Sequence, residues 1–180
     1  MNQIKIFSPA SVANVSCGFD VLGFCLDPIG DIMTVSRTDD KGARIGTVTG
    51  QNLPKDPLKN VATVAASALL KSHSSKNGFR IDIEKKIKPG SGIGSSAASA
   101  AGAVFAINEL LGKPYSRKEL VKFAMVGEAL ASGATHADNL APVLLGGFTL
   151  VRDNKNLDII KLPSPKSLVA TIIHPKIELK

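Results

Sequence analysis

A glycine-rich stretch in the middle of the chain constrains its fold most strongly. It reads Lys88, Pro89, Gly90, Ser91, Gly92, Ile93, Gly94, Ser95, Ser96, Ala97 and Ala98, with three glycines in five positions. Such a stretch turns sharply and lets the backbone approach a ligand closely. A strand-like alternation precedes it at residues 79–84, and an Ala-rich helical pattern follows at residues 97–111. Because a helix start presents N–H groups and a partial positive charge, the stretch predicts a loop that holds a polyphosphate.

The spacing of these glycines differs from that of two commoner nucleotide motifs. The chain has no Gly-x-x-x-x-Gly-Lys-Ser/Thr loop. It also lacks a Gly-x-Gly-x-x-Gly loop followed by an acidic residue about 20 positions later, so dinucleotide binding is weakly supported. A glycine-rich turn that caps an ordinary helix remains the simpler alternative.

Composition describes a globular chain with no sign of a membrane span. Its 180 residues are 44% hydrophobic and 21% charged, enough for one domain with a sizeable core. No apolar run is long enough to cross a bilayer, and the first residues lack a signal peptide's apolar core. Cys17 and Cys25 are the only cysteines and have no metal-binding spacing, so we expect a reducing, cytoplasmic compartment.

A net charge of +7 permits anionic partners, but its distribution does not favour nucleic acid. The lysines are scattered, and no aromatic residues interleave with them for base stacking. Runs such as Glu84, Lys85 and Lys86 therefore indicate a solvated surface with some attraction for anions. We expect no nucleic-acid partner and no membrane partner.

Apolar periodicity predicts strands and helices without a regular alternation of the two. Strands are expected at residues 4–7, 31–38, 43–49, 79–84, 146–151, 157–162 and 168–173, with residues 8–18 as a loop. Helices are expected at residues 60–71, with Asn60 as a cap, at 97–111, and at 117–131 after a capping box from Ser116 to Glu119. This order predicts an α+β fold over residues 1–180 rather than a doubly wound α/β fold.

A second group of candidate residues lies in a polar loop between two apolar segments. His136, Asp138 and Asn139 combine an imidazole, a carboxylate and an amide, which together can orient a polar substrate and handle a proton. The alternative is a hydrogen-bonded turn in which Asp138 or Asn139 caps a short helix.

Two other acidic side chains each allow two interpretations. Glu128 lies in a largely apolar helical stretch, where it either faces solvent or reaches a Mg²⁺ ion held by phosphate oxygens. Asp20 lies with Asn14 in a loop of small residues, where it either binds an ammonium group or holds a structural turn.

Three segments together resemble the three motifs of the GHMP small-molecule kinases: the loop with Asn14 and Asp20, the glycine loop, and the polar loop with His136, Asp138 and Asn139. The glycine loop is similar to that family's Pro-x-x-x-Gly-Leu-Gly-Ser-Ser-Ala motif and matches it from Gly92 to Ala97 except at Ile93, which replaces a Leu. Lys88 stands where the Pro is usual, and Pro89 follows one place later. Within the family, residues 13–23 and 136–147 resemble the corresponding segments of homoserine kinases.

The resemblance implies a fold and a reaction. The fold is the GHMP kinase N-terminal domain, similar to domain 2 of ribosomal protein S5, with the link to a missing ferredoxin-like C-terminal domain near residues 163–180. The reaction is phosphorylation of the side-chain hydroxyl of L-homoserine by ATP, on the route to threonine. We expect this fragment alone to be inactive and to form homo-oligomers. The alternatives are another GHMP kinase, with a mevalonate-type or sugar-alcohol substrate, and a non-catalytic S5-like domain that binds RNA.

The resemblance also implies roles for the candidate residues. Residues 88–98 bind ATP, and Ser96 and Glu128 hold Mg²⁺. The residues that bind homoserine are Asn14, Asp20, His136, Asp138 and Asn139. Of these, Asp138 and Asn139 are the candidate catalytic residues, while the existence of a dedicated general base is left open.

Overall fold

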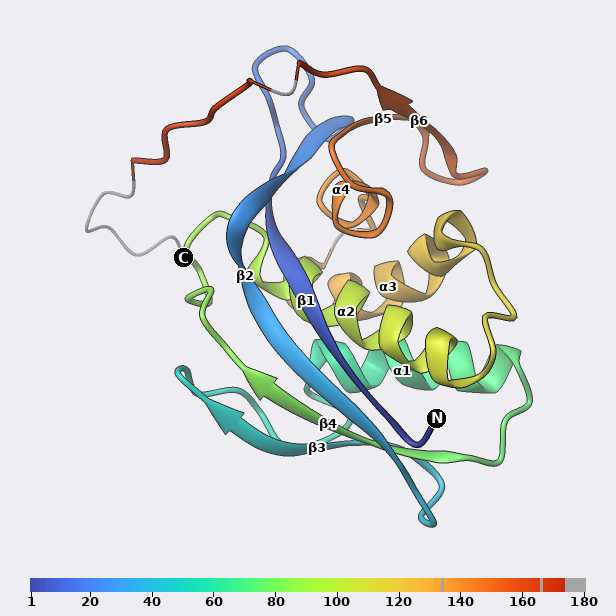
Figure 1. Cartoon of the computed structure of the whole chain (residues 1–180). Helices are drawn as coiled ribbons and strands as arrows, with labels where there is room; N and C mark the ends of the chain where they lie inside the picture. The colour runs from blue at the N-terminus through green and yellow to red at the C-terminus, as the bar shows by residue number, and fades with distance from the viewer. Residues whose placement is uncertain (134, 166, 174–180) are drawn as a thin grey trace.

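The computed structural model describes residues 1–133, 135–165 and 167–173, in which a curved sheet of six strands carries four helices on one face (Figure 1). The strands are β1 (Gln3–Val12), β2 (Leu22–Thr38), β3 (Gly42–Thr49), β4 (Gly78–Glu84), β5 (Phe148–Asp153) and β6 (Asp158–Leu162). The helices are α1 (Val61–Ser72), α2 (Ser95–Leu110), α3 (Arg117–Ser132) and α4 (Leu140–Leu145).

The long strand β2 organises the sheet, whose order is β3-β4-β2-β5-β6 with β1 also paired to β2. The β3–β4 pair is parallel, and the other pairs are antiparallel. Residues 32–38 of β2 pair with β4, whereas residues 22–24 pair with β5. The sheet therefore brings the loop between β1 and β2, at residues 13–21, close to β5 and the segment that leads into it.

Helix α2 lies closest to the sheet because its sequence is made of small side chains. Most of its residues are buried, including Ala97, Ala100, Ala101 and Gly102. A Cβ atom on Gly102 would lie 2.4 Å from Met33 Sδ of β2 and 3.0 Å from Ser8 Cβ of β1, so a larger residue would require these side chains to shift. Close packing of α2 against β1 and β2 fixes where its N-terminal end points.

Most elements expected from the sequence are confirmed, and so is the α+β class. Asn60 caps α1 by accepting a hydrogen bond from the Ala62 N–H at 2.9 Å. Ser116 and Glu119 form the predicted capping box of α3. Among the described residues, no helix is both long and apolar enough to cross a membrane.

Two expectations about strands and loops are wrong. Residues 8–18 are not all loop, because β1 pairs with β2 as far as Val12. Residues 168–173 form no strand, and their side chains at Val169 and Ile173 are 87% and 86% exposed. The Leu168 N–H instead donates to the Pro165 oxygen at 3.2 Å, so the start of this segment is part of a turn. The predicted link at residues 163–180 lies partly outside the described residues.

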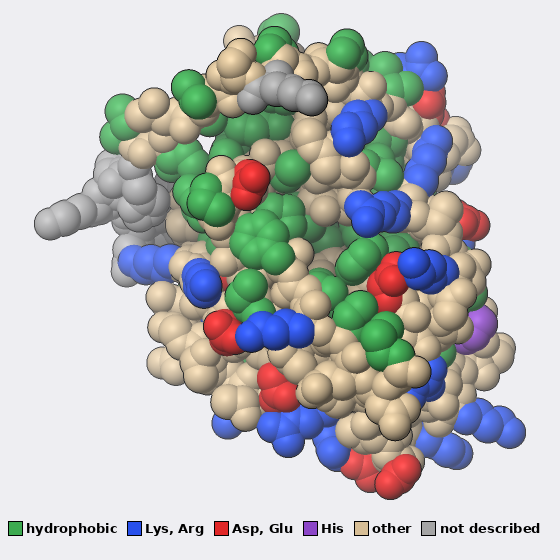
Figure 2. All heavy atoms as spheres, in the orientation of Figure 1, with side chains coloured by type: hydrophobic (Ala, Val, Ile, Leu, Met, Phe, Trp, Pro, Cys, Tyr) green, Lys and Arg blue, Asp and Glu red, His purple; other side chains and the backbone are tan. Residues whose placement is uncertain are grey.

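Charged side chains on the visible face are dispersed. Figure 2 shows Lys and Arg side chains over this face with Asp and Glu side chains between them, not gathered into one basic patch.

Candidate functional site

The glycine loop lies between the end of β4 and the start of α2. Gly90, Gly92 and Gly94 have φ angles of 74°, 77° and 67°, in the left-handed region that favours glycine. Helix α2 begins at Ser95, and Gly94 at its N-cap position supplies no side chain to cap the first turn. The predicted geometry of a glycine loop that leads into a helix N-terminus is confirmed, with the helix starting two residues earlier than expected.

A cleft with a volume of about 500 Å³ opens beside this loop. Six loop residues line it: Pro89, Gly90, Gly92, Gly94, Ser95 and Ser96. The remaining predicted loop residues, Lys88, Ser91, Ile93, Ala97 and Ala98, are not part of the lining. Ala98 is buried in a small apolar cluster, and Ile93 packs against this cluster. These two side chains therefore anchor the loop to the core instead of lining the cleft.

Other walls of the cleft come from the segment that leads into α1 and from α3. Leu53, Pro54 and Val61 contribute apolar surface near the start of α1, and Leu130 contributes apolar surface from α3. Asn60 lines the cleft as well as capping α1. A cleft of this size with apolar and polar walls suits a small organic ligand.

Ser96 and Glu128 meet at the edge of the cleft, although they lie 32 positions apart. The Ser96 hydroxyl donates a hydrogen bond to Glu128 Oε1 at 3.0 Å. Burial raises the pKa of Glu128 above its usual value, and the negative charge of Asp138 adds to the increase. A hydroxyl and a carboxylate are the hard oxygen donors that Mg²⁺ prefers, so the pair fits the predicted metal site.

The polar loop at residues 136–139 is partly buried beside this pair. The Asp138 side chain is buried, which raises its pKa, although the hydrogen bond from the Asn139 N–H at 3.0 Å acts in the opposite direction. Asn139 stands at the N-cap of α4, but its side chain makes no capping bond. Its Oδ1 atom instead accepts a hydrogen bond from the Ser11 hydroxyl of β1 at 2.8 Å.

Two glycines bring the three motifs into contact. A Cβ atom on Gly94 would lie 2.0 Å from Ser11 Oγ and 3.1 Å from Asn139 Oδ1. A Cβ atom on Gly23 would lie 2.0 Å from the backbone oxygen of Asp138. A larger residue at either position would force these segments to shift, so the glycines set the distance between the glycine loop and the polar loop.

Asn14, Asp20 and His136 lie together outside the lining of the cleft. Asn14 Oδ1 accepts a hydrogen bond from the Asp20 N–H at 2.8 Å, so this amide shapes the turn that presents Asp20. His136 Nδ1 lies 3.2 Å from Asp20 Oδ1, and both side chains are well exposed. The negative charge of Asp20 also raises the pKa of Asp138, which links this group to the polar loop.

Residues 60–147 match the protein family described as GHMP kinases N terminal domain. This match contains the glycine loop, Glu128 and the polar loop at residues 136–139. The chain carries a GHMP kinase N-terminal domain. The fold class expected from the sequence is therefore confirmed.

Relatives that share this domain resemble the chain over nearly all of its length. A homoserine kinase from Chloroherpeton thalassium is 44% identical over 99% of the chain, and one from Methanococcus vannielii is 37% identical over all of it. The chain spans 60% of the length of each of these relatives.

Solved structures show the same similarity. The crystal structure of homoserine kinase from Cytophaga hutchinsonii is 50% identical, has a TM-score of 0.93, and is covered over 58% of its chain. The Methanococcus jannaschii mevalonate kinase, at 18% identity and a TM-score of 0.67, shares the fold.

A buried ion pair that the sequence patterns did not predict lies beneath the glycine loop. Lys85 Nζ lies 2.5 Å from Asp31 Oδ2, and the two side chains are 1% and 0% exposed. The interpretation of Lys85 as a solvated surface residue is therefore wrong. Burial lowers the pKa of Lys85, and the Asp31 carboxylate counteracts that effect.

Strand alternation was the signal that could have revealed this pair. Ile81, Ile83 and Ile87 are buried at alternate positions of β4 and its continuation, and Lys85 lies in the same phase. Asp31 likewise lies in phase with the buried Met33 and Val35 of β2. Since alternate side chains of a strand share one face, both charges were placed on the buried side.

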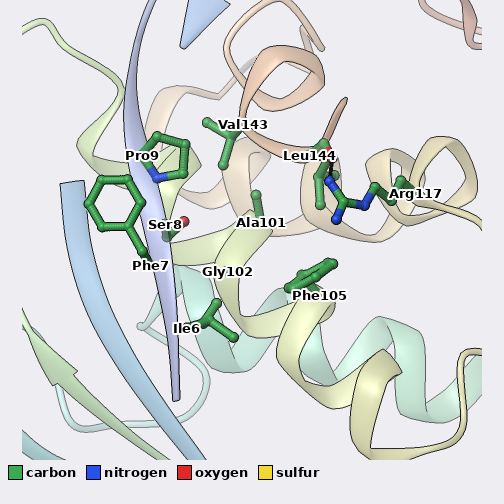
Figure 3. Close-up of a pocket in the computed structure, with 10 residues that line it drawn as sticks. All are labelled: Ile6, Phe7, Ser8, Pro9, Ala101, Gly102, Phe105, Arg117, Val143 and Leu144. Carbon is green, nitrogen blue, oxygen red and sulfur yellow. Dashed lines mark hydrogen bonds between the residues drawn. The ribbon is translucent and has the colours of Figure 1, made fainter. Parts of the chain in front are cut away.

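A second cavity, of about 220 Å³, lies against the middle of α2 and contains none of the predicted site residues (Figure 3). Its polar side chains already have partners: Ser8 donates to the Ala98 oxygen at 2.7 Å, and Arg117 donates to the Leu144 oxygen at 3.3 Å. The Arg117 guanidinium also lies 5.0 Å from the centre of the Phe105 ring. This cavity therefore offers little polar recognition, in contrast to the cleft beside the glycine loop.

Proposed function

We propose that this chain is the ATP-binding part of a homoserine kinase, which transfers the γ-phosphoryl group of ATP to the side-chain hydroxyl of L-homoserine in threonine biosynthesis. The observation that carries the proposal is the glycine loop leading into an uncapped α2, with Ser96 and Glu128 paired at the edge of the same cleft. The homoserine kinases at 37–50% identity support the choice of substrate.

The nucleotide would lie in the cleft with its phosphates against residues 88–98. Backbone N–H groups of the loop and of the first turn of α2 would bind the phosphate oxygens. Leu53, Pro54 and Leu130 offer apolar contacts for the base. Ser96 and Glu128 would hold Mg²⁺, which offsets the negative charge that the phosphates carry in the transition state.

Homoserine would bind beside the polar loop, with its ammonium group near Asp20. His136 and Asn14 hold the Asp20 region in place, and Asn139 links the polar loop to the phosphate cleft. The homoserine oxygen would attack the γ-phosphorus as the bond to the bridging oxygen of ADP breaks. Asp138 is the candidate acceptor of the hydroxyl proton, because burial raises its pKa toward the value that a base needs.

Gly92→Val tests the nucleotide site. A branched side chain at a φ of 77° would distort the loop, so ATP binding should be lost while the circular dichroism spectrum stays unchanged. Unchanged ATP affinity would contradict the assignment of residues 88–98. In a protein spanning the full length of the relatives, faster ADP release with mevalonate than with homoserine would contradict the substrate.

The state of the 180-residue chain itself is a further part of the proposal. We propose that it turns over homoserine negligibly, resides in the cytoplasm and forms homo-oligomers through exposed apolar side chains such as Leu168 and Val169. Light scattering tests the oligomeric state, and an ADP-release assay with ATP, Mg²⁺ and homoserine tests the turnover. Robust turnover by a monomer would contradict both expectations.

A further inference from the structure

We propose that Asp31 is a positioning residue for the glycine loop, because its carboxylate connects both ends of the loop and so sets the shape of the phosphate site. The inference rests on the proposed nucleotide site. It assigns a role to a residue of β2 that does not itself line the cleft.

Asp31 directly holds the two residues that lead into the loop. Its Oδ1 atom accepts hydrogen bonds from the N–H groups of Lys86 and Ile87, at 2.8 and 2.9 Å. A buried carboxylate that accepts backbone N–H groups fixes the path of the chain at that point. The loop therefore leaves β4 in one direction.

Asp31 holds the other end of the loop through Lys85. The Lys85 ammonium group donates to Asp31 Oδ2 at 2.5 Å, to the Ser95 oxygen at 2.7 Å and to Ser99 Oγ at 3.0 Å. Ser95 Oγ also donates to the Ile87 oxygen at 3.1 Å. These bonds join residues 85–87 to the first turn of α2 and close the loop at its base.

The loop requires such an anchor because its own sequence is flexible. Its glycines have many accessible conformations, and ordering them when the ligand binds would cost affinity. If the base of the loop is closed when the protein folds, the loop is already ordered before the ligand binds, and the cost of ordering it does not reduce ligand affinity. The same network fixes Ser95, next to the proposed metal ligand Ser96.

Stability alone explains the ion pair poorly. A buried ion pair often contributes no more than an apolar pair of the same volume, because desolvation opposes the attraction between the charges. Every other ion pair between described residues has at least one side chain that is 38% exposed or more. The one pair removed from water lies directly beneath the phosphate loop.

Asp31→Asn in the 180-residue chain tests the proposal. It keeps an acceptor for the backbone N–H groups but removes the charge that holds Lys85. We expect ATP affinity to fall about tenfold while adenosine affinity stays within about twofold, because preorganisation of the phosphate site is lost and the base contacts are not. If Asp31 only neutralised the charge of Lys85, ATP would bind more tightly to the variant, and that result would overturn the proposal.

Two further variants separate positioning from folding. Leu120→Ala removes a buried side chain of α3 and should lower the unfolding temperature without changing the ratio of ATP to adenosine affinity. The double variant Asp31→Asn, Lys85→Met removes both buried charges and is expected to fold even if the single variant does not. In it, amide hydrogen exchange at residues 88–94 should be faster, whereas exchange in β4 should not change.

Wild-type exchange at residues 88–94 together with wild-type ATP affinity in the double variant would overturn the proposal. If the unmodified chain binds no ATP, the proposed function and this inference both fail. If the unmodified chain binds ATP and Asp31→Asn binds it equally well, this inference alone fails.

Discussion

The glycine loop is anchored by side chains that solvent does not reach, whereas Asp20 and His136 meet at the surface. The Asp31 and Lys85 side chains are 0% and 1% exposed, compared with 38% for Asp20 and 43% for His136. A carboxylate interacts with a cationic or potentially cationic group in both places. Water screens the second interaction, and such exposed pairs contribute little to stability.

The backbone differs between the two regions in the same way. The glycine loop uses glycine at each of its left-handed positions, whereas the loop between β1 and β2 has positive φ angles at Asn14, Ser16 and Asp20. A left-handed conformation costs energy for residues other than glycine and persists where its surroundings impose it. If the proposed sites are correct, the half that binds the nucleotide is formed in advance, and the half that binds the substrate depends on a few local bonds.

The largest expected effect comes from Gly94→Ala, which should distort the glycine loop. The new Cβ atom would lie 2.0 Å from Ser11 Oγ, and the φ of 67° adds a backbone cost of about 1–2 kcal/mol. ATP affinity should fall about 100-fold, which corresponds to roughly 2.7 kcal/mol. Gly42→Ala is the matched control, because Gly42 has a φ of 85° and open space around its Cβ position. Equal ATP affinities in the two variants, measured by calorimetry, would contradict the preformed loop.

Glu128→Gln should remove the dependence of ATP affinity on Mg²⁺ while stabilising the unliganded chain at pH 7. Burial raises the pKa of Glu128 in the folded state, so the folded protein binds this proton more tightly than the unfolded protein does. Stability is therefore lost as the pH rises from the unfolded pKa through the raised folded pKa, and a neutral Gln avoids that loss. Thermal unfolding at pH 7 and near pH 4 checks this, since the difference should shrink at the acidic pH. Glu109→Gln, at a partly buried carboxylate paired with Lys113, is the control and should leave Mg²⁺ dependence unchanged.

Asp20→Asn should weaken homoserine binding about tenfold and leave ATP affinity nearly unchanged, because it removes a charge partner for the ammonium group. Titration of each ligand, followed by nuclear magnetic resonance, measures both effects. Asp158→Asn, which disrupts an exposed pair with Arg152, is a control of the same chemistry. Equal losses of affinity for homoserine and for ATP would show that the proposed substrate and nucleotide sites do not act separately.

The smallest effect on ligands is expected from Ser116→Ala. This variant removes the capping box of α3 and should lower the free energy of unfolding by about 1 kcal/mol. Neither ATP nor homoserine affinity should change, since the cap lies at the opposite end of α3 from Glu128. A loss of ATP affinity larger than twofold would show that α3 couples its ends more strongly than the contacts suggest.

Local sequence patterns determined much of this protein. Glycines at alternate positions before an Ala-rich segment gave the loop and the start of α2, and the caps at Asn60 and Ser116 gave the starts of α1 and α3. These features depend on residues within a few positions of one another, so their physical causes can be read along the chain. The same kind of pattern failed at residues 168–173, where apolar residues found no strand to pair with.

Tertiary structure alone decided which distant residues share an environment. Asp31 and Lys85 are 54 positions apart, and Ser96 and Glu128 are 32 positions apart. Their contacts depend on the pairing of β2 with β4 and on the packing of α2 against α3, which no local pattern specifies. The charge of Lys85 reads as a surface feature in the sequence because its burial is favourable only when Asp31, Ser95 and Ser99 surround it.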